Sequence, residues 1–304
     1  MRSFRSLRAP SLTALLFSLL AGTLSAQPVD RFVDGDDGVR IHYLDWGTEG
    51  RRPLIMLHGI GRVAHTFDHV APRFVDDFHV LAVDMRGHGD SGWDPNGNYL
   101  VEDYVADIES MVANLGLDDI VLWGNSTGGR VAQVFAGKRP DLVSALIVED
   151  VGPERPESIA SNLAERIRRE EEGWESQEAL FEQMQRGSPR TRPEVLRAYA
   201  QYGSKVREED GRTIFKRDPR INDGFVPTDL WRFVREIEAP TIYILGGAST
   251  IVSPETQAAL RNTLPRVEIE IMPGLGHYPS EESPDAFLAI VERFLNGVDR
   301  EADE

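Results

Sequence analysis

The sequence predicts an α/β fold in which a doubly wound, mostly parallel sheet carries an inserted helical segment. Short β-branched runs alternate with longer segments of helical period from Val29 onward, a pattern typical of parallel strands joined by helical crossovers. Several of these runs are almost continuously apolar, as expected for strands buried on both faces of a parallel sheet. The alternation stops after Val151, which indicates an insertion.

The predicted strands are Val39–Trp46, Leu54–Leu57, His79–Val83, Ile120–Trp123, Ala145–Val148, Thr241–Leu245 and Val267–Met272. Between them, Val101–Leu115 has apolar residues at three- and four-residue spacing, which predicts a helix that Gly116 ends. A second helix is predicted over Arg130–Ala136.

Residues 153–238 are predicted to form a helical lid, inserted between core segments 27–152 and 239–304. Within the lid we expect helical structure in Glu157–Arg186, Glu194–Arg207 and Leu230–Ile237, and a hairpin or loop at Gly211–Pro219. The many charged residues of the first of these segments are interpreted as a solvated helix face.

The first 26 residues have the pattern of a signal peptide. Arg2, Arg5 and Arg8 precede an apolar stretch, Leu12–Leu24, and a small-x-small cleavage site ends at Ala26. An uncleaved anchor is the alternative, but the stretch is shorter than the roughly 20 residues that span a bilayer. We therefore expect residues 1–26 to be removed, the mature chain to be exported to the periplasm or the extracellular space, and no stable membrane insertion afterwards.

Charge and composition exclude several classes of partner and cofactor. The formal net charge is −17, and loss of the three arginines of residues 1–26 would take it to −20. Such acidity disfavours binding to nucleic acid or to an anionic membrane. The chain has no cysteine, which rules out disulfides, thiolate nucleophiles and Cys-ligated metals. Neither the zinc-binding motif His-Glu-x-x-His nor a phosphate-binding motif occurs, so we expect no metal and no other cofactor.

Ser126 lies in the strongest local motif. It is the centre of Gly124-Asn125-Ser126-Thr127-Gly128, which follows a predicted strand and precedes a predicted helix. In that context the glycines relieve crowding in a strained turn that exposes the serine hydroxyl. We interpret Ser126 as a nucleophile; a glycine-lined turn without chemistry is the alternative.

A serine nucleophile needs a base, and His277 is the candidate. It lies in the loop Pro273–Pro279, directly after the last predicted strand and at the sheet edge from which Ser126 emerges. His42, His69 and His79 are interpreted as surface or structural histidines, and nothing local gives His65 a role.

The sequence resembles the α/β-hydrolase superfamily, in its lid-bearing, serine esterase-like branch. The resemblance rests on four motifs in the family's order: His58-Gly59-Ile60-Gly61, Asp84-Met85-Arg86-Gly87-His88-Gly89-Asp90-Ser91, the turn around Ser126, and Gly276-His277. It implies the α/β-hydrolase fold and a Ser-His-acid triad. The lid matches the family only in position and helical character.

The acid of the triad departs from the commonest family pattern, in which it follows the strand Thr241–Leu245. No carboxylate occurs between Gly246 and Ser253. A minority of the superfamily places the acid after the preceding strand, and here Asp150 follows Ala145–Val148. Neighbouring strand residues face opposite sides, so Glu149 and Asp150 cannot both serve. Asp150 is the predicted acid, with Glu149 as the alternative and a merely structural role for Asp150 as a third reading.

By resemblance, the backbone N–H groups of Ile60 and Thr127 would form the oxyanion hole, and His58 and Arg86 would brace the surrounding loops. The predicted function is a serine hydrolase that cleaves a small carboxylic ester or lactone through an acyl-enzyme. The same residues also serve C–C bond hydrolysis, amide hydrolysis, acyl transfer and perhydrolysis. A ligand-binding homologue without catalysis is the alternative from another class.

Overall fold

A computed structural model describes residues 27–155, 165–166, 168–222 and 226–302. The predicted signal peptide, residues 1–26, lies outside the described residues. So does much of the first half of Glu157–Arg186, for which helical structure was expected.

The described core is an eight-stranded, mostly parallel sheet. Its strands are β1 (Val29–Asp34), β2 (Arg40–Asp45), β3 (Pro53–Leu57), β4 (His79–Val83), β5 (Ile120–Asn125), β6 (Val143–Glu149), β11 (Thr241–Gly246) and β12 (Val267–Met272). They lie in the order β1-β2-β4-β3-β5-β6-β11-β12, and only the pairs that involve β2 are antiparallel. The seven predicted strands are confirmed. β1 was not predicted, because this edge strand is mostly exposed and carries polar residues that hide its pattern.

The helices include α1 (Val101–Leu115), α2 (Thr127–Lys138), α4 (Gln177–Gly187), α5 (Pro193–Tyr202), α6 (Trp231–Val234), α7 (Pro254–Thr263), α8 (Pro279–Glu282) and α9 (Pro284–Ala302). Short 3-10 turns are η1 (Asp36–Gly38), η2 (Ala64–Phe67), η3 (Ala71–Arg73) and η4 (Pro219–Asn222). The predicted helix α1 is confirmed at both ends. Asp103 Oδ2 accepts from the Leu100 N–H at 2.6 Å, and Gly116 takes the left-handed conformation, with φ 64°, that ends many helices.

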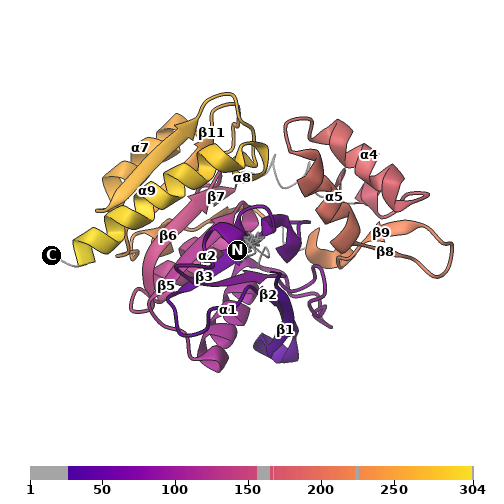
Figure 1. Cartoon of the computed structure of the whole chain (residues 1–304), viewed down its shortest axis with the longest axis horizontal. Helices are drawn as coiled ribbons and strands as arrows, with labels where there is room; N and C mark the ends of the chain where they lie inside the picture. Colours follow the sequence, from indigo (N-terminus) through magenta and orange to yellow (C-terminus); the bar gives the residue numbers. More distant parts are fainter. Residues whose placement is uncertain (1–26, 156–164, 167, 223–225, 303–304) are drawn as a thin grey trace, which may run out of the picture.

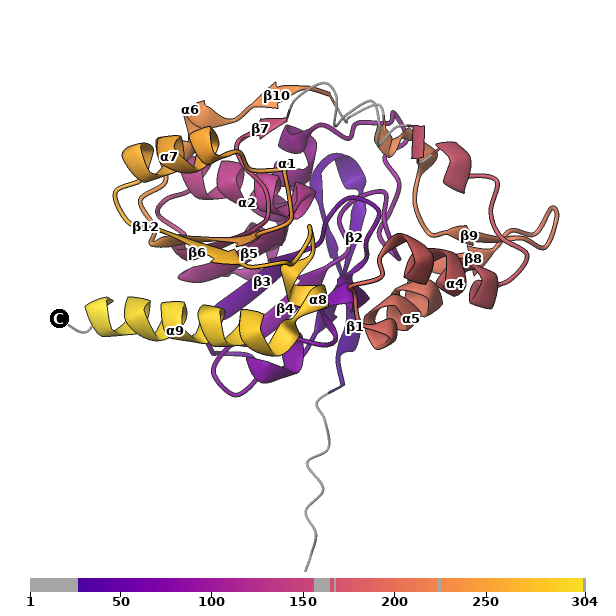
Figure 2. The same ribbon diagram turned by 90° about the horizontal axis from the view of Figure 1, so that it is seen from above.

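Helices cover both faces of the sheet (Figure 2), so the apolar core consists of two layers of side chains, one on each side of the sheet. On one face the sheet packs against α1, α2 and α7, and on the other against α9 and the turns η2 and η3. Trp123 of β5 is fully buried in the second layer, where its ring stacks on Phe287 of α9 with centroids 5.1 Å apart. Burying each such side chain contributes about 2 kcal/mol to stability, and together the two layers fix the sheet edge that carries the site.

The insertion stands to one side of the core and has its own small apolar cluster (Figure 1). Leu180 and Phe181 of α4 pack there with Leu196 and Tyr199 of α5, and Val63 from the loop after β3 joins them. Because Val63 belongs to the core chain, this cluster is also the apolar seam between core and insertion.

Some expectations for the insertion were wrong in detail. The predicted helix Glu194–Arg207 ends at Tyr202, since the chain then enters β8 (Ser204–Val206), which pairs with β9 (Thr213–Phe215). The predicted helix Leu230–Ile237 is reduced to the single turn α6. A second two-stranded ladder joins β7 (Glu154–Arg155) to β10 (Thr228–Asp229) where the insertion leaves and re-enters the core. The segment therefore combines helices with two small ladders.

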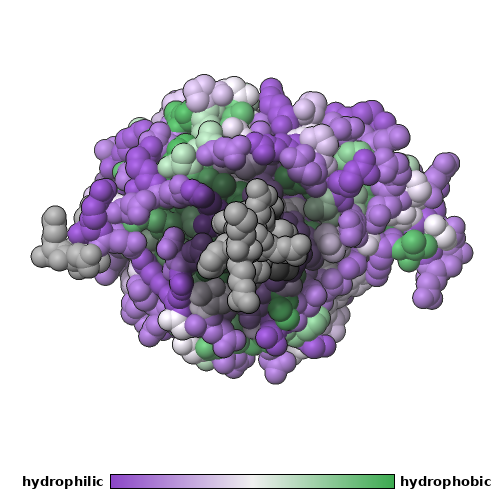
Figure 3. Space-filling view, viewed as in Figure 1, coloured by the Kyte–Doolittle hydropathy of each residue, from purple (hydrophilic) through white to green (hydrophobic). Residues whose placement is uncertain are grey.

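Most of the face seen in Figure 3 is hydrophilic, with scattered apolar groups, one of them over the β8–β9 hairpin. In the part of the chain that the structure describes, no helix has the length and apolar character needed to cross a membrane.

Candidate functional site

Ser126 lies in a strained turn between β5 and α2. Its backbone has φ 50° and ψ −116°, a conformation that costs energy for a residue with a side chain. A Cβ on Gly124 would lie 2.3 Å from the Gly128 carbonyl oxygen, and one on Gly128 would lie 2.1 Å from the Leu57 carbonyl oxygen. Only glycine fits at these two positions, so the flanking glycines of the motif are explained by close packing of the turn.

His277 follows β12 and lies directly against Ser126. Its Nε2 is 3.0 Å from Ser126 Oγ, and its Nδ1 is 2.7 Å from Asp150 Oδ2. A carboxylate can only accept, so Nδ1 carries the proton in this arrangement and Nε2 is free to accept the Ser126 proton. The structure thus brings the three predicted side chains into one hydrogen-bonded chain.

Asp150 is held firmly in place at the end of β6. It is 1 % exposed, and its backbone φ is 47°, in the left-handed region. Oδ1 accepts the Gly246 N–H at 2.9 Å, and Oδ2 accepts both the Ser249 hydroxyl at 2.6 Å and His277. These hydrogen bonds orient the carboxylate toward the imidazole.

Ser249 is a residue that the sequence analysis missed. It lies in the loop after β11, where most relatives were expected to carry the acid, and instead of supplying a carboxylate this loop binds the one from β6. The loop from Gly246 to Ser253 also carries the hydroxyls of Thr250 and Ser253, so nothing in the sequence singled out Ser249.

Glu149 faces the other way from Asp150. It is fully buried, its Oε1 accepts the Ser280 N–H at 2.8 Å, and its Oε2 accepts the Trp123 indole N–H at 3.3 Å. Burial raises the pKa of Glu149 to about 8, since desolvation disfavours the charged form. The residue is therefore a neutral acid below that pH. Among the described residues, His277 is hydrogen-bonded to Asp150 and Ser126 and not to Glu149.

The two predicted oxyanion donors lie in segments that pack on each other. Gly128 N–H donates to the His58 carbonyl at 3.1 Å, and a Cβ on Gly59 would lie 3.2 Å from Ser126 Cβ. Within the described residues, the N–H groups of Ile60 and Thr127 have no hydrogen-bond acceptor. For Thr127 this is the ordinary state of a first-turn amide, and it leaves that group available to a ligand.

His58 and Arg86 brace loops, as predicted. His58 Nδ1 donates to the Gly59 carbonyl at 2.8 Å, and its Nε2 accepts the Met85 N–H at 3.0 Å. Burial lowers the pKa of His58, so the ring stays neutral, as this pair of hydrogen bonds requires. The Arg86 guanidinium forms a two-point pair with Asp107, at 2.6 and 2.8 Å.

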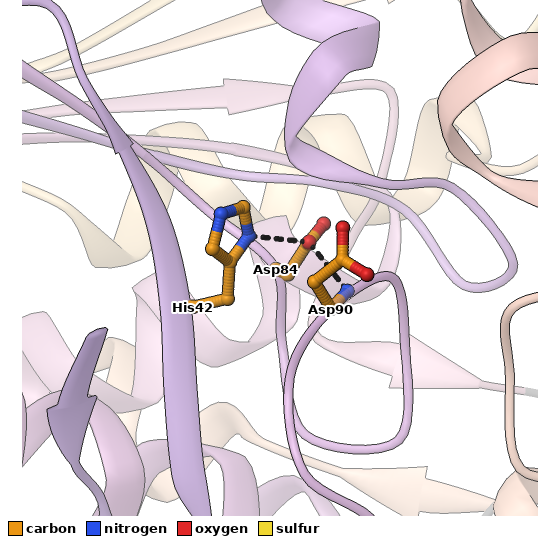
Figure 4. Close-up of side chains that lie close together, drawn as sticks. All are labelled: His42, Asp84 and Asp90. Atoms are coloured by element: carbon orange, nitrogen blue, oxygen red, sulfur yellow. Dashed lines mark hydrogen bonds and ion pairs between the residues drawn. The ribbon is translucent and has the colours of Figure 1, made fainter. Parts of the chain in front are cut away.

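His42, Asp84 and Asp90 come close enough to suggest a metal site (Figure 4). Their atoms are already used otherwise: Asp84 accepts from His42 Nδ1 at 2.7 Å and from the amides of Ala64 and Asp90 at 2.6 and 2.9 Å. The Asp90 carboxylate pairs with Lys216 at 2.9 and 3.0 Å. The cluster thus ties the loop after β4 to β2 and to the insertion. The sequence analysis interpreted His42 as either a surface or a structural histidine. His42 is buried, so the structural interpretation is the one that holds.

A cavity of about 440 Å³ lies between the site and the insertion. Ile60, one of the two predicted oxyanion donors, and Tyr278, which follows His277 in the chain, line it from the core side. Side chains of the insertion, among them Trp174, Leu196 and Phe215, line the rest. Since Ser126 and His277 are not in the lining, the cavity is a space beside the hydrogen-bonded chain.

Comparison with known proteins finds relatives in sequence and in fold. A 3-hydroxybutyrate-oligomer hydrolase of Cupriavidus necator is 28% identical over 90% of this chain and 100% of its own length. An esterase of Mycobacterium tuberculosis is 29% identical over 84% of this chain and 86% of its own. The crystal structure of an E-2-(acetamidomethylene)succinate hydrolase superposes with a TM-score of 0.80 at 26% identity, covering 88% of this chain and 99% of that one.

The family model described as the alpha/beta hydrolase family matches residues 54–290, which include the strand before the oxyanion loop, the turn at Ser126 and the loop of His277. The match spans most of the chain, and the strand order is that of the predicted fold. This protein belongs to the alpha/beta hydrolase family.

Proposed function

We propose that the protein is a serine hydrolase that cleaves small carboxylic esters or lactones through an acyl-enzyme. The observation that carries the proposal is the hydrogen-bonded chain from Ser126 Oγ through His277 to Asp150, at 3.0 and 2.7 Å. Two relatives bear names of ester-cleaving activities, the 3-hydroxybutyrate-oligomer hydrolase and the esterase, which favours an ester over other acyl substrates.

In the proposed mechanism, Ser126 Oγ attacks the carbonyl carbon while His277 Nε2 takes its proton. Asp150 holds the imidazole in the tautomer that accepts this proton and stabilises the imidazolium that results. The imidazolium then protonates the leaving alkoxide. Water, activated by the same nitrogen, hydrolyses the acyl-enzyme and regenerates Ser126.

The tetrahedral intermediates carry a negative oxygen, which the N–H groups of Ile60 and Thr127 would bind. Thr127 begins α2, so the partial positive charge of that helix end also favours an anion there. Loss of one such donor typically costs about 3 kcal/mol of transition-state stabilisation.

Labelling with a fluorophosphonate probe tests the nucleophile. We expect one adduct per chain, located on Ser126 by peptide mass spectrometry, and none in Ser126→Ala. Ser249→Ala is the control for a nearby hydroxyl that is not the nucleophile, and it should keep the adduct. Folded protein that takes no label at Ser126 would show that the chain is a binding homologue instead.

A panel of p-nitrophenyl esters of graded chain length, together with lactones, tests the substrate class. Turnover that disappears in Ser126→Ala supports the proposal. If the probe labels Ser126 but no ester or lactone is hydrolysed, the ester assignment is wrong and amide or C–C bond cleavage replaces it.

We also propose export, on the pattern of residues 1–26 alone. Sequencing the N-terminus of secreted material should find residue 27 or a close neighbour, and retention of Met1 would contradict export by cleavage.

A further inference from the structure

The cavity beside Ser126 differs in charge from the rest of the protein. Its described lining holds the arginines Arg62, Arg166, Arg169 and Arg217 and the carboxylates Glu165 and Glu170. With Glu281, which pairs with Arg62, four guanidinium groups face three carboxylates, an excess of one positive charge. The whole chain, in contrast, has a formal charge of −17. A local excess of guanidinium groups in an acidic protein favours an anion at this place.

Arg217 is a fixed part of this lining. It is 8% exposed, and its Nη2 donates to Glu170 Oε2 at 2.6 Å. The backbone on both sides is attached to the loop after β4, because Gly89 N–H donates to Lys216 O and Asp218 N–H donates to Gly87 O, each at 2.8 Å. The guanidinium is thus held in place before any ligand binds, which lowers the entropy cost of binding.

Part of the Arg217 guanidinium is available to a ligand. Its Nε and Nη1 have no hydrogen-bond partner among the described residues. Nη1 lies 3.0 Å from the position of a Cβ on Gly61, whose φ is 72°. Glycine at 61 therefore allows both the turn of the oxyanion loop and the approach of the arginine to it.

Arg62 offers a second guanidinium from the core side. Its Nε and Nη2 donate to the two Glu281 oxygens at 3.0 and 3.1 Å, and Nη1 remains without a partner in the described structure. The group lies between the rings of Tyr199 and Tyr278, at 5.0 and 4.2 Å from their centroids. Glu281 offsets the charge of Arg62, but the two-point pair uses only two of the three guanidinium nitrogens, so Nη1 is left to donate to a ligand.

The distance from the nucleophile suits a single small substrate. Gly59 contacts Ser126, and Gly61, two residues further on, contacts Arg217. Two residues of chain span at most about 7 Å, so, with the two contacts added, Arg217 Nη1 lies no more than about 13 Å from Ser126 Cβ. A molecule whose ester carbonyl is at Ser126 can reach the arginines through a short carbon chain.

We propose that the arginine cavity binds a carboxylate of the substrate, so that the preferred substrate is an ester that carries a free carboxylate a few carbons from the scissile bond. The inference rests on the proposed ester hydrolysis, and it makes Arg217 and Arg62 specificity-determining residues. The net charge of −17 would by itself disfavour an anionic ester on encounter, and the arginine cavity reverses that preference at the site itself.

The experiment compares mono-p-nitrophenyl esters of succinic, adipic and suberic acid with the matching carboxamides, which have the same length and no charge. We expect kcat/KM for at least one carboxylate to exceed that of its carboxamide about tenfold or more, and the ratio to fall as ionic strength rises. A ratio of one or less at every length, with the carboxamides hydrolysed, would overturn the inference and leave the proposed function standing.

Arg217→Gln should reduce this ratio about tenfold, and Arg217→Lys should keep part of it, because lysine retains the charge without the planar fork. Arg197→Gln is the matched control: this exposed arginine of α5 pairs with Glu178 and is outside the cavity lining, so the ratio should not change. Thermal unfolding of each variant verifies that it is folded. An unchanged ratio in folded Arg217→Gln would contradict the assignment.

Calorimetric binding of free adipate separates the two proposals. Binding that weakens about tenfold in Arg217→Gln supports the anion site even if no ester is hydrolysed, in which case only the proposed function fails. Absence of adipate binding to a protein that hydrolyses neutral esters overturns the anion site alone.

Discussion

The core and the insertion hold their functional groups by different means. In the core, Ser126 and Asp150 follow directly after β5 and β6, and His277 lies in the loop that follows β12, so the ends of neighbouring strands set their positions. In the insertion, Arg217 and its neighbours are placed by ion pairs, loop contacts and a small apolar cluster. Strand ends thus carry the chemistry, whereas the insertion shapes the space in which a substrate would lie. The predictions below test this division, from the largest expected effect to the smallest.

Asp150→Asn should lower kcat by about four orders of magnitude, because an amide at this position favours the wrong imidazole tautomer. Glu149→Gln is the matched neighbour and should change kcat only a few-fold at neutral pH, since Glu149 binds Ser280 and Trp123 instead of His277. Steady-state ester hydrolysis measures both. If kcat fell more in Glu149→Gln than in Asp150→Asn, Glu149 and not Asp150 would be the acid that orients His277.

The stability of the core should depend on pH through Glu149, whose pKa burial raises to about 8. Below about pH 4.5 both the folded and the unfolded chain hold this proton. Between there and about pH 8 only the folded chain does, so ionisation of the unfolded state increasingly favours unfolding, by up to about 1.4 kcal/mol per pH unit and roughly 5 kcal/mol in all. Denaturant unfolding of wild type and Glu149→Gln across this range checks it, as the difference between the two should decline steadily. A constant difference would show that Glu149 is ionised in the folded protein.

The pair Arg62–Glu281 connects the oxyanion loop to α8 at the boundary with the insertion. Glu281→Gln removes the charge partner of a largely buried arginine and should lower the free energy of unfolding by about 3 kcal/mol. Glu292→Gln breaks the exposed pair with Arg73 and should cost far less, because water screens the two charges. Equal costs in urea unfolding would indicate that water screens the boundary as it screens the surface.

The smallest effect concerns two equivalent helix caps, one in each region. Ser176 caps α4 of the insertion and Ser253 caps α7 of the core, each accepting a backbone N–H at 3.1 Å. Serine to alanine should cost about 1 kcal/mol at either position. If the insertion opens independently, Ser176→Ala will speed hydrogen exchange in α4 and α5 only, while Ser253→Ala will not affect them. Faster exchange throughout the molecule in both variants would show one cooperative unit.

The same division explains what the sequence could predict. The strands and α1 have strong periodicity or apolar runs, and the site residues follow strand ends in a known order, so their proximity was predictable. The choice of Asp150 over Glu149 needed the alternation of strand side chains. Ser249 was missed because a hydroxyl that binds a carboxylate has no pattern of its own, and the arginine cavity was missed because its charges come from distant segments.

The strand β8 and the shortness of α6 were not predicted for a related reason, whereas β9 lies within the hairpin or loop expected at Gly211–Pro219. Three-residue strands and one-turn helices are too short to show a period, and Gly203 and the following hairpin outweigh the helical pattern of Glu194–Arg207. Contacts with the rest of the fold determine the secondary structure of such short segments.

The short ladder between β7 and β10 gives the insertion a defined base. Thr228 pairs with Arg155 and Asp229 with Glu154, so the two ends of the insertion leave the core side by side. Ser126 and Asp150 both precede this point in the chain, and His277 follows it. A lid from a related protein could therefore be grafted between these two strands without changing the length of chain between Ser126 and Asp150, and substrate range could be exchanged as a module while the reaction stays the same.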